Sequence, residues 1–590
     1  MLPSANLGPS QDGPFSLGAF AIDEYNPIKV VVIGAGFSGI AAAIRFPQRV
    51  PNLDLTVYDQ NAGVGGTWYS NKYPGLACDI PSHCYQYTFE NKTDWSSFYS
   101  TGSEIRSYLE SVVDKYKLMR YIKLSHRLIR AQYDEPSGKW RLRIRRPASQ
   151  GSSPSTDLEE FEEFDDTADI LFMGVGSLSR WGWPDISGLH DFKGSLFHTA
   201  NFDIGEQTWQ EATQKWKDKR VGVIGVGSSA IQVVPALQPH VAHIVNYVKG
   251  KTWISVPFGS DKLSELLHRD PNEENYIFTD EDKARFADPE YYKRFRHALD
   301  TELNAVYQCG LKDSAMQRGA RAAFREHMQK ALSKKPWIAD DLIPDYAVAC
   351  RRLTCGPGYL RALCEDNVDF VTTHIKRITS SGIETVDGRH EELDVIICAT
   401  GYDYSFQLDF PVIGRGGVSL QEKWTPHPST YLAICTDGFP NYFMAFGPSS
   451  SLASGSLVVL IERQVDYAVE ATKKLQRERL KSIEVKKAAV QDFDEYLEHY
   501  FPKTVHSEKC RSWYKMGKED GRVVALWPGS ALHALRALEF PRWEDYNYEL
   551  ADGAQNRMRW LGDGQTYNEK MMKGDRAWFL NDDEIDVPPG

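Results

Sequence analysis

The chain has 590 residues, of which 42% are hydrophobic and 25% charged, a composition typical of a globular protein with a large core. Its formal net charge of −12 disfavours nucleic acid and anionic membrane surfaces as partners. The sequence lacks the run of about 18 apolar residues that a membrane span requires, and its N-terminus does not resemble a secretory signal. Nine cysteines are scattered without metal-ligand spacing, so we expect reduced thiols, no metal site and a cytoplasmic protein.

A glycine-rich loop follows the first predicted strand. Gly34, Gly36 and Gly39 have the spacing G-x-G-x-x-G between the apolar run 30–33 and a predicted helix that starts near residue 40. Such a turn lets backbone N–H groups and the helix dipole hold a pyrophosphate. A second predicted strand, 53–59, ends at Asp59, where a carboxylate can bind an adenosine ribose; an ordinary acidic residue of a turn is the alternative.

A second loop of the same kind lies about 190 residues further on. Gly225 and Gly227 follow the apolar run 221–224, Ala230 takes the place of the third glycine, and a helix is predicted from residue 231. One such loop is a weak signal. Two loops, each between a strand and a helix, predict two dinucleotides in one protein, most simply a flavin and a nicotinamide cofactor.

These signals predict an α/β fold with two Rossmann-like dinucleotide-binding domains, the first interrupted by the second. We expect a flexible arm over residues 1–27, the first part of the flavin domain over 28–189, and the nicotinamide domain over 190–389. The nicotinamide domain should contain a helical insertion at about 262–343, and residues 390–590 should return to the flavin domain and add a C-terminal extension. Within the first domain, 131–144 predicts a hairpin, and the Ser- and acid-rich segment 150–166 predicts an exposed loop.

Three motifs resemble those of the Baeyer–Villiger monooxygenases, which are class B flavoprotein monooxygenases. They are Gly65-Gly66-Thr67-Trp68…Tyr73-Pro74-Gly75…Asp79, Phe192-x-Gly194…His198…Phe202-Asp203, and Ala399-Thr400-Gly401-Tyr402-Asp403. The resemblance covers about residues 30–528, and the Trp527-Pro528-Gly529 region is similar to fungal secondary-metabolite members. The residues themselves disfavour a flavin disulfide reductase, because Cys78 and Cys84 are spaced too widely for a redox pair.

The resemblance implies FAD and NADPH as cofactors. The flavin-binding residues that it implies, together with the first loop, are Gly34, Gly36, Gly39, Asp59, Gly66, Thr67, Trp68, Asp79 and Tyr85. The nicotinamide-binding residues that it implies, together with the second loop, are Gly225, Gly227, Ser228, Ser229, Gln232, Lys249, Arg351 and Trp513. Aromatic side chains in the first motif suit a dry pocket, although they could equally pack the domain interface.

Arg352 and Asp79 are the implied catalytic pair. Attack on a ketone by activated oxygen develops negative charge, which a fixed cation can stabilise. Arg352 matches the position of the family's catalytic arginine, and Asp79 matches the carboxylate that orients it. Without the resemblance, an Arg-Arg pair would more often belong to a solvated surface or a structural ion-pair network.

Four residues are interpreted separately. Lys249 can bind the 2′-phosphate of NADPH, but Lys249-Gly250 departs from the Arg-Ser/Thr pair that the family usually has, so selectivity over NADH is open. His198 is conceivable as a general base, but we expect a linker residue that holds backbone carbonyls and couples the domains. Phe202 stands where Trp is usual and lacks the indole N–H. Core packing is the alternative for Trp513.

The sequence therefore predicts a monooxygenase that uses FAD, NADPH and O2 to convert a ketone into an ester or lactone. S- or N-oxygenation or hydroxylation with the same cofactors is one alternative, and a non-catalytic NADPH-binding sensor is another. The ketone and the oligomeric state are left open.

Overall fold

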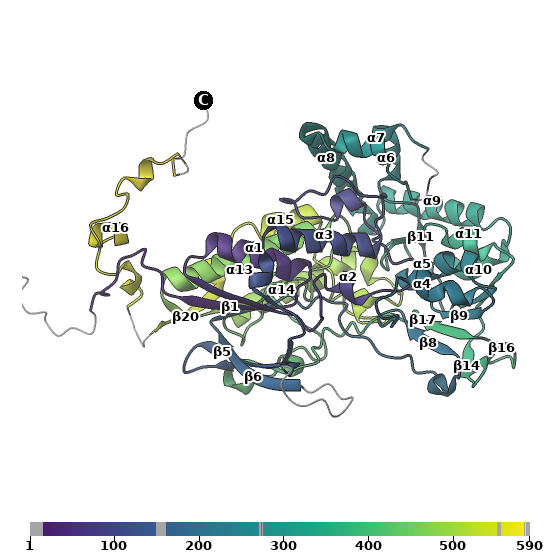
Figure 1. The fold of residues 1–590 in the computed structure, drawn as a ribbon, viewed down its shortest axis with the longest axis horizontal. Helices are drawn as coiled ribbons and strands as arrows, with labels where there is room; N and C mark the ends of the chain where they lie inside the picture. Colours follow the sequence, from purple (N-terminus) through teal and green to yellow (C-terminus); the bar gives the residue numbers. More distant parts are fainter. Residues whose placement is uncertain are drawn as a thin grey trace, which may run out of the picture.

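The computed structural model describes residues 16–148, 161–270, 273, 275–551, 556–582 and 584–585. Two parallel β-sheets dominate it, one in each half of the molecule (Figure 1). The first sheet has the order β19-β7-β1-β2-β3 and the second the order β13-β10-β9-β17-β8. The mixed α/β architecture with two Rossmann-like units is the one predicted.

The first sheet carries the first glycine-rich loop. Its central strands β1 and β7 are almost entirely buried, as expected for parallel strands that are covered on both faces. Helices α1 and α13 pack together on this unit, and α3 lies beside them (Figure 1). The bounds are β1 Ile28–Ile33, α1 Phe37–Arg49, β2 Leu53–Tyr58, α2 Thr67–Ser70, α3 Gly102–Lys115, β3 Ile122–Lys123, β7 Ile170–Met173, β19 Tyr442–Met444 and α13 Leu457–Arg477.

The second sheet carries the second loop and differs from the prediction at one boundary. Strand β17 lies beyond residue 390, where we expected the chain to have returned to the first domain, but it pairs with β8 and β9. Its buried sequence VIIC lies between β9 and the edge strand β8 of the second sheet instead. The bounds are β8 Ser195–His198, α4 Trp209–Thr213, β9 Arg220–Ile224, α5 Ser228–Leu237, β10 His243–Tyr247, α11 Tyr359–Leu363, β13 Val368–Val371 and β17 Val395–Cys398.

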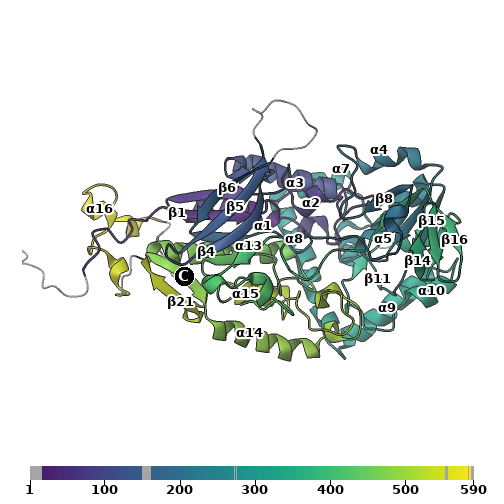
Figure 2. The same cartoon turned by 90° about the horizontal axis from the view of Figure 1, so that it is seen from below.

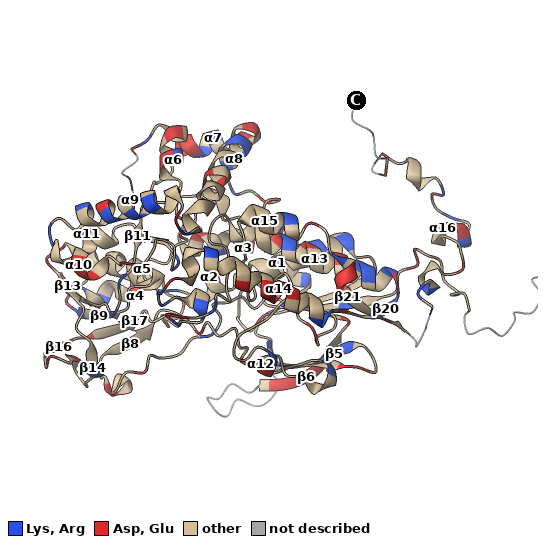
Figure 3. Ribbon diagram, turned by 180° about the vertical axis from the view of Figure 1, so that it is seen from behind, with Lys and Arg blue, Asp and Glu red and all other residues tan. Residues whose placement is uncertain are grey.

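Helices fill the segment where an insertion was expected. The bounds are α6 Ser260–Leu267, α7 Asp280–Phe286, α8 Pro289–Ala305, α9 Ala315–Ala331 and α10 Trp337–Leu342. Helices α6, α7 and α8 project together from the body (Figure 1), and several positions along α9 are Lys or Arg, coloured blue in Figure 3. Short strands β11 (Ile254–Ser255) and β12 (Thr354–Cys355) pair before and after this helical segment.

An antiparallel layer lies against the first unit (Figure 2). The predicted hairpin forms between β4 (Arg127–Asp134) and β5 (Lys139–Pro147). The loop expected over 150–166 is wrong at its end, because residues 161–166 belong to β6 (Phe161–Ala168), which pairs with β5. Cross-strand ion pairs such as Arg146–Glu162 explain how so acidic a segment becomes a strand. Residues 149–160 lie outside the described residues.

The remaining elements complete the two units. They are β14 Ile375–Ile378, β15 Gly382–Thr385, β16 His390–Glu392, β18 Val412–Ile413, α12 Leu420–Lys423, β20 Leu480–Val485, α14 Lys487–Tyr500, α15 Ala531–Ala537, β21 Tyr546–Leu550 and α16 Tyr567–Lys570. In the described part of the chain, none of the helices is both long and apolar enough to cross a membrane.

The arm predicted over residues 1–27 falls partly outside the described residues, which begin at 16. Its described part pairs with the C-terminal extension: the N–H of Ile22 donates to the carbonyl of Gln565 at 3.0 Å, and the N–H of Asp563 donates to that of Phe20 at 2.9 Å. The described part of the arm and the C-terminal extension therefore lie together, with α16 standing away from the body (Figure 1).

Candidate active site

A cavity of about 1760 Å³ runs between the two units. It lies at the carboxyl ends of the parallel strands and is lined by the turns that follow β1, β2, β9, β10 and β17. Ligands of open α/β sheets bind at this edge. The cavity is larger than a typical pocket of about 300–1,000 Å³, as two dinucleotides and a substrate require.

The first loop has the shape that a pyrophosphate needs. Gly34 has φ +104°, and a Cβ there would lie 2.4 Å from the carbonyl oxygen of Gly174. A Cβ on Gly39 would lie 1.7 Å from the carbonyl oxygen of Gly34, so the helix packs directly on the turn. Gly36 and Gly66 face each other, since a Cβ on Gly66 would lie 3.0 Å from the Cα of Gly36. Two backbone segments therefore approach the cavity without side chains between them.

Asp59 follows the end of β2 and lines the cavity, as predicted. Its carboxylate accepts the N–H of Ala35 at 2.6 Å and the N–H of Asn61 at 2.7 Å, so it also shapes the glycine-rich loop. Burial raises the pKa of Asp59, while these two N–H groups act in the opposite direction. Each carboxylate oxygen keeps a second acceptor position for a ribose hydroxyl.

The segment from Thr67 to Tyr85, which is rich in aromatic residues, forms the wall of the cavity beside this loop. Thr67 and Trp68 open the short helix α2, and the Trp68 ring meets that of Tyr85 edge to face at 5.7 Å. Burial raises the pKa of Tyr85 far above its usual range, so this phenol stays neutral. All three side chains line the cavity.

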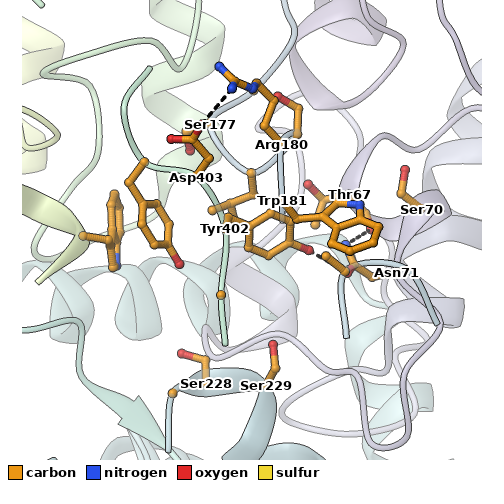
Figure 4. Close-up of a pocket in the computed structure, with 18 of the residues that line it drawn as sticks. Thr67, Ser70, Asn71, Ser177, Arg180, Trp181, Ser228, Ser229, Tyr402 and Asp403 are labelled. Carbon is orange, nitrogen blue, oxygen red and sulfur yellow. Dashed lines mark hydrogen bonds and ion pairs between the residues drawn. The ribbon is translucent and has the colours of Figure 1, made fainter. Parts of the chain in front are cut away.

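The second loop repeats the backbone geometry of the first. Gly225 has φ +130°, and a Cβ there would lie 2.4 Å from the carbonyl oxygen of Ala399. A Cβ on Gly227 would meet nothing within 4 Å, so this glycine presents bare backbone to the cavity. Ser228 and Ser229 begin α5 and lie at the cavity (Figure 4). This is the arrangement that binds a second pyrophosphate.

Gln232, a predicted cofactor-binding residue, also joins two segments of the protein. Its side-chain oxygen accepts the hydroxyl of Tyr73 at 2.9 Å, and its side-chain nitrogen donates to the carbonyl of Ala77 at 2.9 Å. Gly75 packs so closely on α5 that a Cβ would lie 2.4 Å from the carbonyl oxygen of Gln232. The Tyr-Pro-Gly segment thus joins the first unit to the second, although Gln232 also lines the cavity.

Arg352 and Asp79 form the predicted pair, although 273 residues separate them. Arg352 Nε donates to Asp79 Oδ2 at 3.0 Å, and Arg352 Nη2 donates to Asp79 Oδ1 at 2.8 Å. This bidentate geometry fixes the guanidinium plane. The side chains keep 30% and 20% exposure, so both can contact a ligand in the cavity.

The electrostatics of the pair favour a permanent cation. Burial lowers the pKa of Arg352, but the Asp79 carboxylate more than reverses that effect, and the net pKa lies above the ordinary arginine value. Tyr514 lies against the same guanidinium; burial raises the Tyr514 pKa to about 12 even though Arg352 acts to lower it. The pair therefore presents a fixed positive charge next to a neutral phenol.

The predicted nicotinamide-binding cations lie on the same wall. Lys249 follows β10 with an exposed side chain at the cavity. Arg351 donates to the carbonyl of Lys251 at 3.1 Å, which anchors it nearby. Trp513 lines the cavity and stacks on Tyr404 with ring centroids 5.7 Å apart. Its side chain therefore packs against another ring and is also available to a ligand in the cavity.

His198 lies at the end of β8, the edge strand of the second sheet, and contacts the loop that follows the neighbouring strand β17. The N–H of Ala200 donates to its Nδ1 at 3.1 Å, so Nε2 carries the proton and donates to Thr400 Oγ1 at 3.1 Å. These partners are an N–H and a hydroxyl, not the backbone carbonyls that we expected. Trp181 stacks on the ring at 4.6 Å. Burial lowers the pKa of His198 to about 4, so it is neutral near pH 7.

Two polar contacts that the sequence did not indicate connect the segments between the units. Arg180 Nη2 donates to Asp403 Oδ2 at 2.9 Å, and the hydroxyl of Tyr402 donates to Asn71 Oδ1 at 2.7 Å (Figure 4). Tyr402 and Asp403 belong to the Ala-Thr-Gly-Tyr-Asp motif, whose spacing alone names no partner. These contacts join the loop after β17 to the loop after β7, through Arg180, and to the segment that follows α2, through Asn71.

The cysteines also differ from the prediction. Cys350 and Cys510 form a disulfide with a Cα–Cα distance of 6.4 Å across 160 residues, and the other seven cysteines are free thiols. Cys78 and Cys84 are among the free thiols, which supports the exclusion of a flavin disulfide reductase. Among the described residues, no cluster of three His, Cys, Asp or Glu side chains is arranged to hold a metal ion.

Comparison with known proteins identifies the family. Residues 32–101 match the model of the NAD(P)-binding Rossmann-like domain. The chain is 38% identical to the FAD-binding monooxygenase tazF of Aspergillus terreus over 558 residues, which cover 94% of each chain. It is 34% identical to a Baeyer–Villiger monooxygenase of Pseudomonas aeruginosa, over 85% of this chain and 88% of that protein. The chain belongs to the Baeyer–Villiger type of flavoprotein monooxygenases.

A solved structure extends the likeness to three dimensions. Cyclohexanone monooxygenase from Rhodococcus sp. Phi1, bound to NADP+, superposes with a TM-score of 0.73 at 27% identity, covering 89% of this chain and all of that chain. This monooxygenase uses FAD and NADPH, as predicted, and a non-catalytic sensor is excluded. The two bare-backbone loops, each at the carboxyl end of a parallel sheet, fit these two dinucleotides.

Phe202 shows how the monooxygenase accommodates its departure from the family motif. The ring is 2% exposed and stacks on Phe197 at 4.6 Å, with Trp216 at 6.4 Å. An apolar ring suits this cluster because it brings no N–H that would need a partner.

Proposed function

We propose that this monooxygenase inserts one oxygen atom of O2 next to the carbonyl of a ketone and so forms an ester or a lactone, with NADPH as the reductant. The observation that carries the proposal is the bidentate Arg352–Asp79 pair at the cavity. A fixed guanidinium stabilises negative charge on oxygen, which an attack on a carbonyl requires. Bound FAD would supply the oxygen chemistry.

The chain's own residues prepare that chemistry in three ways. The glycine-rich loops and Asp59 hold the dinucleotides, and Lys249 with Arg351 would hold the 2′-phosphate of NADPH. Trp68, Tyr85 and Trp513 line the cavity with aromatic surface, which excludes water from the reacting groups. Arg352 supplies positive charge, and Asp79 keeps its plane in one orientation.

The similarity to fungal relatives supports a proposal for the substrate class. The relative from Aspergillus terreus is matched along nearly its whole length, and the sequence resembles fungal secondary-metabolite oxygenases. We infer a ketone of secondary metabolism, acted on in the cytoplasm. The cavity volume leaves room for a bulky ketone beside both dinucleotides.

Incubation with cyclic, linear and polycyclic ketones and with thioethers, under ¹⁸O-labelled oxygen gas, tests the proposal. Mass spectrometry should find one labelled oxygen in an ester or lactone. Labelled sulfoxides with unreacted ketones would instead assign the protein to S-oxygenation. The same assay on Arg352→Ala should lose ester formation, since a ketone needs the cation and a thioether needs it less.

A further inference from the structure

The Cys350–Cys510 disulfide lies between two segments of the active-site wall. Cys350 is two residues before Arg352, and Cys510 is three residues before Trp513. Both cysteines are buried, at 0% and 2% exposure. A chain spans at most about 3.5 Å per residue. The Cα of Cys350 therefore lies within about 7 Å of the Arg352 Cα, and the Cα of Cys510 within about 11 Å of the Trp513 Cα.

The segment after Cys510 is a turn closed on itself. Arg511 Nε donates to the carbonyl of Gly517 at 3.0 Å, and the N–H of Gly517 donates to the carbonyl of Ser512 at 2.9 Å. The N–H of Tyr514 donates to Ser512 Oγ at 3.2 Å. The N–H groups of Val524 and Ala525 donate to the carbonyl of Tyr514 at 2.9 and 3.3 Å, so residues 511–517 form one unit that is tied to the following segment and, through Cys510, to Cys350.

Noncovalent contacts between the two segments lie on both sides of Cys510: His506 and Glu508 precede it, and Tyr514, which lies against Arg352, follows it. His506 Nδ1 contacts the carbonyl of Ala349 at 3.0 Å, and the N–H of Ala347 donates to Glu508 Oε2 at 3.1 Å. The disulfide joins Cys510, which directly precedes the turn, to Cys350 in the segment that bears Arg352. It therefore fixes the distance between that turn and the segment that bears Arg352.

The turn presents two aromatic side chains to the site. Trp513 lines the cavity and stacks on Tyr404. Tyr514 is 2% exposed and lies against the Arg352 guanidinium. The two rings themselves meet edge to face at 4.6 Å, so a shift of one carries the other.

We propose that Cys350 and Cys510 are positioning residues, whose disulfide holds the Trp513–Tyr514 turn against Arg351 and Arg352 as one rigid wall of the active site. The inference rests on the proposed function only where Arg352 is taken to stabilise negative charge on oxygen. The hold on the nicotinamide cofactor, through Arg351 and Trp513, depends on the cofactor assignment alone.

Loss of the disulfide should affect cofactor binding and coupling rather than the fold. Reacting groups placed by rigid walls lose efficiency steeply when they are displaced, by up to about 100-fold for 1 Å. Without the disulfide the turn loses its covalent link to the segment that bears Arg352, so Trp513 and Tyr514 can shift relative to Arg352 while the two Rossmann-like units stay intact. If Arg351 and Trp513 held the nicotinamide cofactor less firmly, more of the electrons from NADPH would reduce oxygen to hydrogen peroxide without oxygenating the substrate.

A small dithiol can open the disulfide by exchange. One thiolate of the reagent bonds to the sulfur of Cys350 and expels Cys510 as a thiolate; the second thiol then displaces Cys350 and leaves a cyclic disulfide of the reagent. Two electrons and two protons pass from the reagent to the protein. The Lys515 ammonium lies 3.9 Å from Cys510 Sγ and stabilises that sulfur as the departing thiolate.

Thiol counting under denaturing conditions tests whether the bond exists in the protein. Seven of the nine cysteines should react before reduction and all nine after it. Peptide mapping should recover residues 350 and 510 in one crosslinked peptide. Nine reactive thiols in carefully unreduced protein would overturn the proposal.

Kinetics of the purified holoenzyme test the positioning role. In Cys350→Ser/Cys510→Ser, anaerobic reduction of the flavin should need about tenfold more NADPH for half-maximal rate, and the hydrogen peroxide formed per NADPH oxidised should rise several-fold. Dithiothreitol should move the wild type toward these values and leave the double variant unchanged. Cys309→Ser, a free thiol outside the cavity, is the matched control and should behave as the wild type.

The readouts separate the possible failures. A purely structural disulfide would lower the melting temperature and flavin content of the double variant, with the NADPH dependence and peroxide ratio of each folded, flavin-loaded molecule unchanged; that result refutes the positioning role. If the wild type makes no ester from any ketone, the proposed function fails, but the NADPH dependence of anaerobic flavin reduction still tests the disulfide, because that step needs no ketone.

Discussion

The substitution Asp79→Asn tests the central pair most directly. It preserves the size of the side chain and removes its charge. The amide offers one acceptor oxygen, and its NH2 group would face an N–H of Arg352, so the fork of hydrogen bonds at 2.8 and 3.0 Å cannot form. Arg352 keeps its charge but loses its fixed direction.

The magnitude follows from the geometry. Two unit charges about 4 Å apart are worth about 4 kcal/mol at an effective dielectric constant of about 20, before desolvation. Because the side chains retain 20% and 30% exposure, solvent screening reduces this value. We take about 2 kcal/mol, which corresponds to an approximately thirtyfold slower oxygenation.

Two measurements isolate the step. Stopped-flow reduction of the flavin by NADPH without oxygen should change by less than about threefold, because hydride transfer does not need an oriented Arg352. Ester formation by the same preparation should fall about thirtyfold, and Arg352→Ala should fall further. The matched control is Asp466→Asn, which removes an equally exposed carboxylate from the Arg49–Asp466 pair away from the cavity. Ester formation within threefold of the wild type in Asp79→Asn would refute the orienting role.

Three further predictions concern the cofactor loops and the linker histidine. Lys249→Ala should raise the KM for NADPH roughly tenfold and the KM for NADH little; equal changes in steady-state assays would place the 2′-phosphate elsewhere. Gly39→Ala puts a Cβ 1.7 Å from the carbonyl oxygen of Gly34 and should abolish flavin binding, measured as the ratio of flavin to protein absorbance; Gly319→Ala, in open space on α9, should retain the flavin. Because burial lowers the pKa of His198 to about 4, the unfolded chain binds more protons between pH 6.5 and 4, and stability falls as the pH falls through that window. His198→Gln should make the melting temperature less dependent on pH there, and an unchanged slope would assign the effect to other groups.

Local patterns allowed the cofactor loops to be predicted from the sequence. The strand, the glycine spacing and the helix start are contiguous, and the positive φ of Gly34 and Gly225 is a requirement that only a few residue types meet. The Asp59 position followed from the length of the second strand. Arg352 and Asp79 could be paired only through the family resemblance, because nothing in the spacing of residues 273 positions apart indicates contact.

The sequence could not indicate contacts that form between distant segments. The Cys350–Cys510 bond joins two cysteines of nine that have no distinctive spacing. The sequence predicts Gln232 as a cofactor-binding residue, but it does not indicate the hydrogen bonds of its amide to Tyr73 and Ala77. Strand β17 was assigned to the first unit because a buried strand that leads to a glycine turn echoes the strand that starts at Asp169, and only its pairing decides the sheet.

The arrangement of the site explains why so many of its residues serve the contact between the two units. Arg352 belongs to the second half of the chain and Asp79 to the first, so the fork between them exists only while the units hold one relative position. Tyr73 and Gln232 fix that position beside Asp79, and the Cys350–Cys510 disulfide fixes the wall beside Arg352. A residue can therefore change oxygenation without touching a ligand, by altering the distance between a carboxylate and a guanidinium that it does not itself contact.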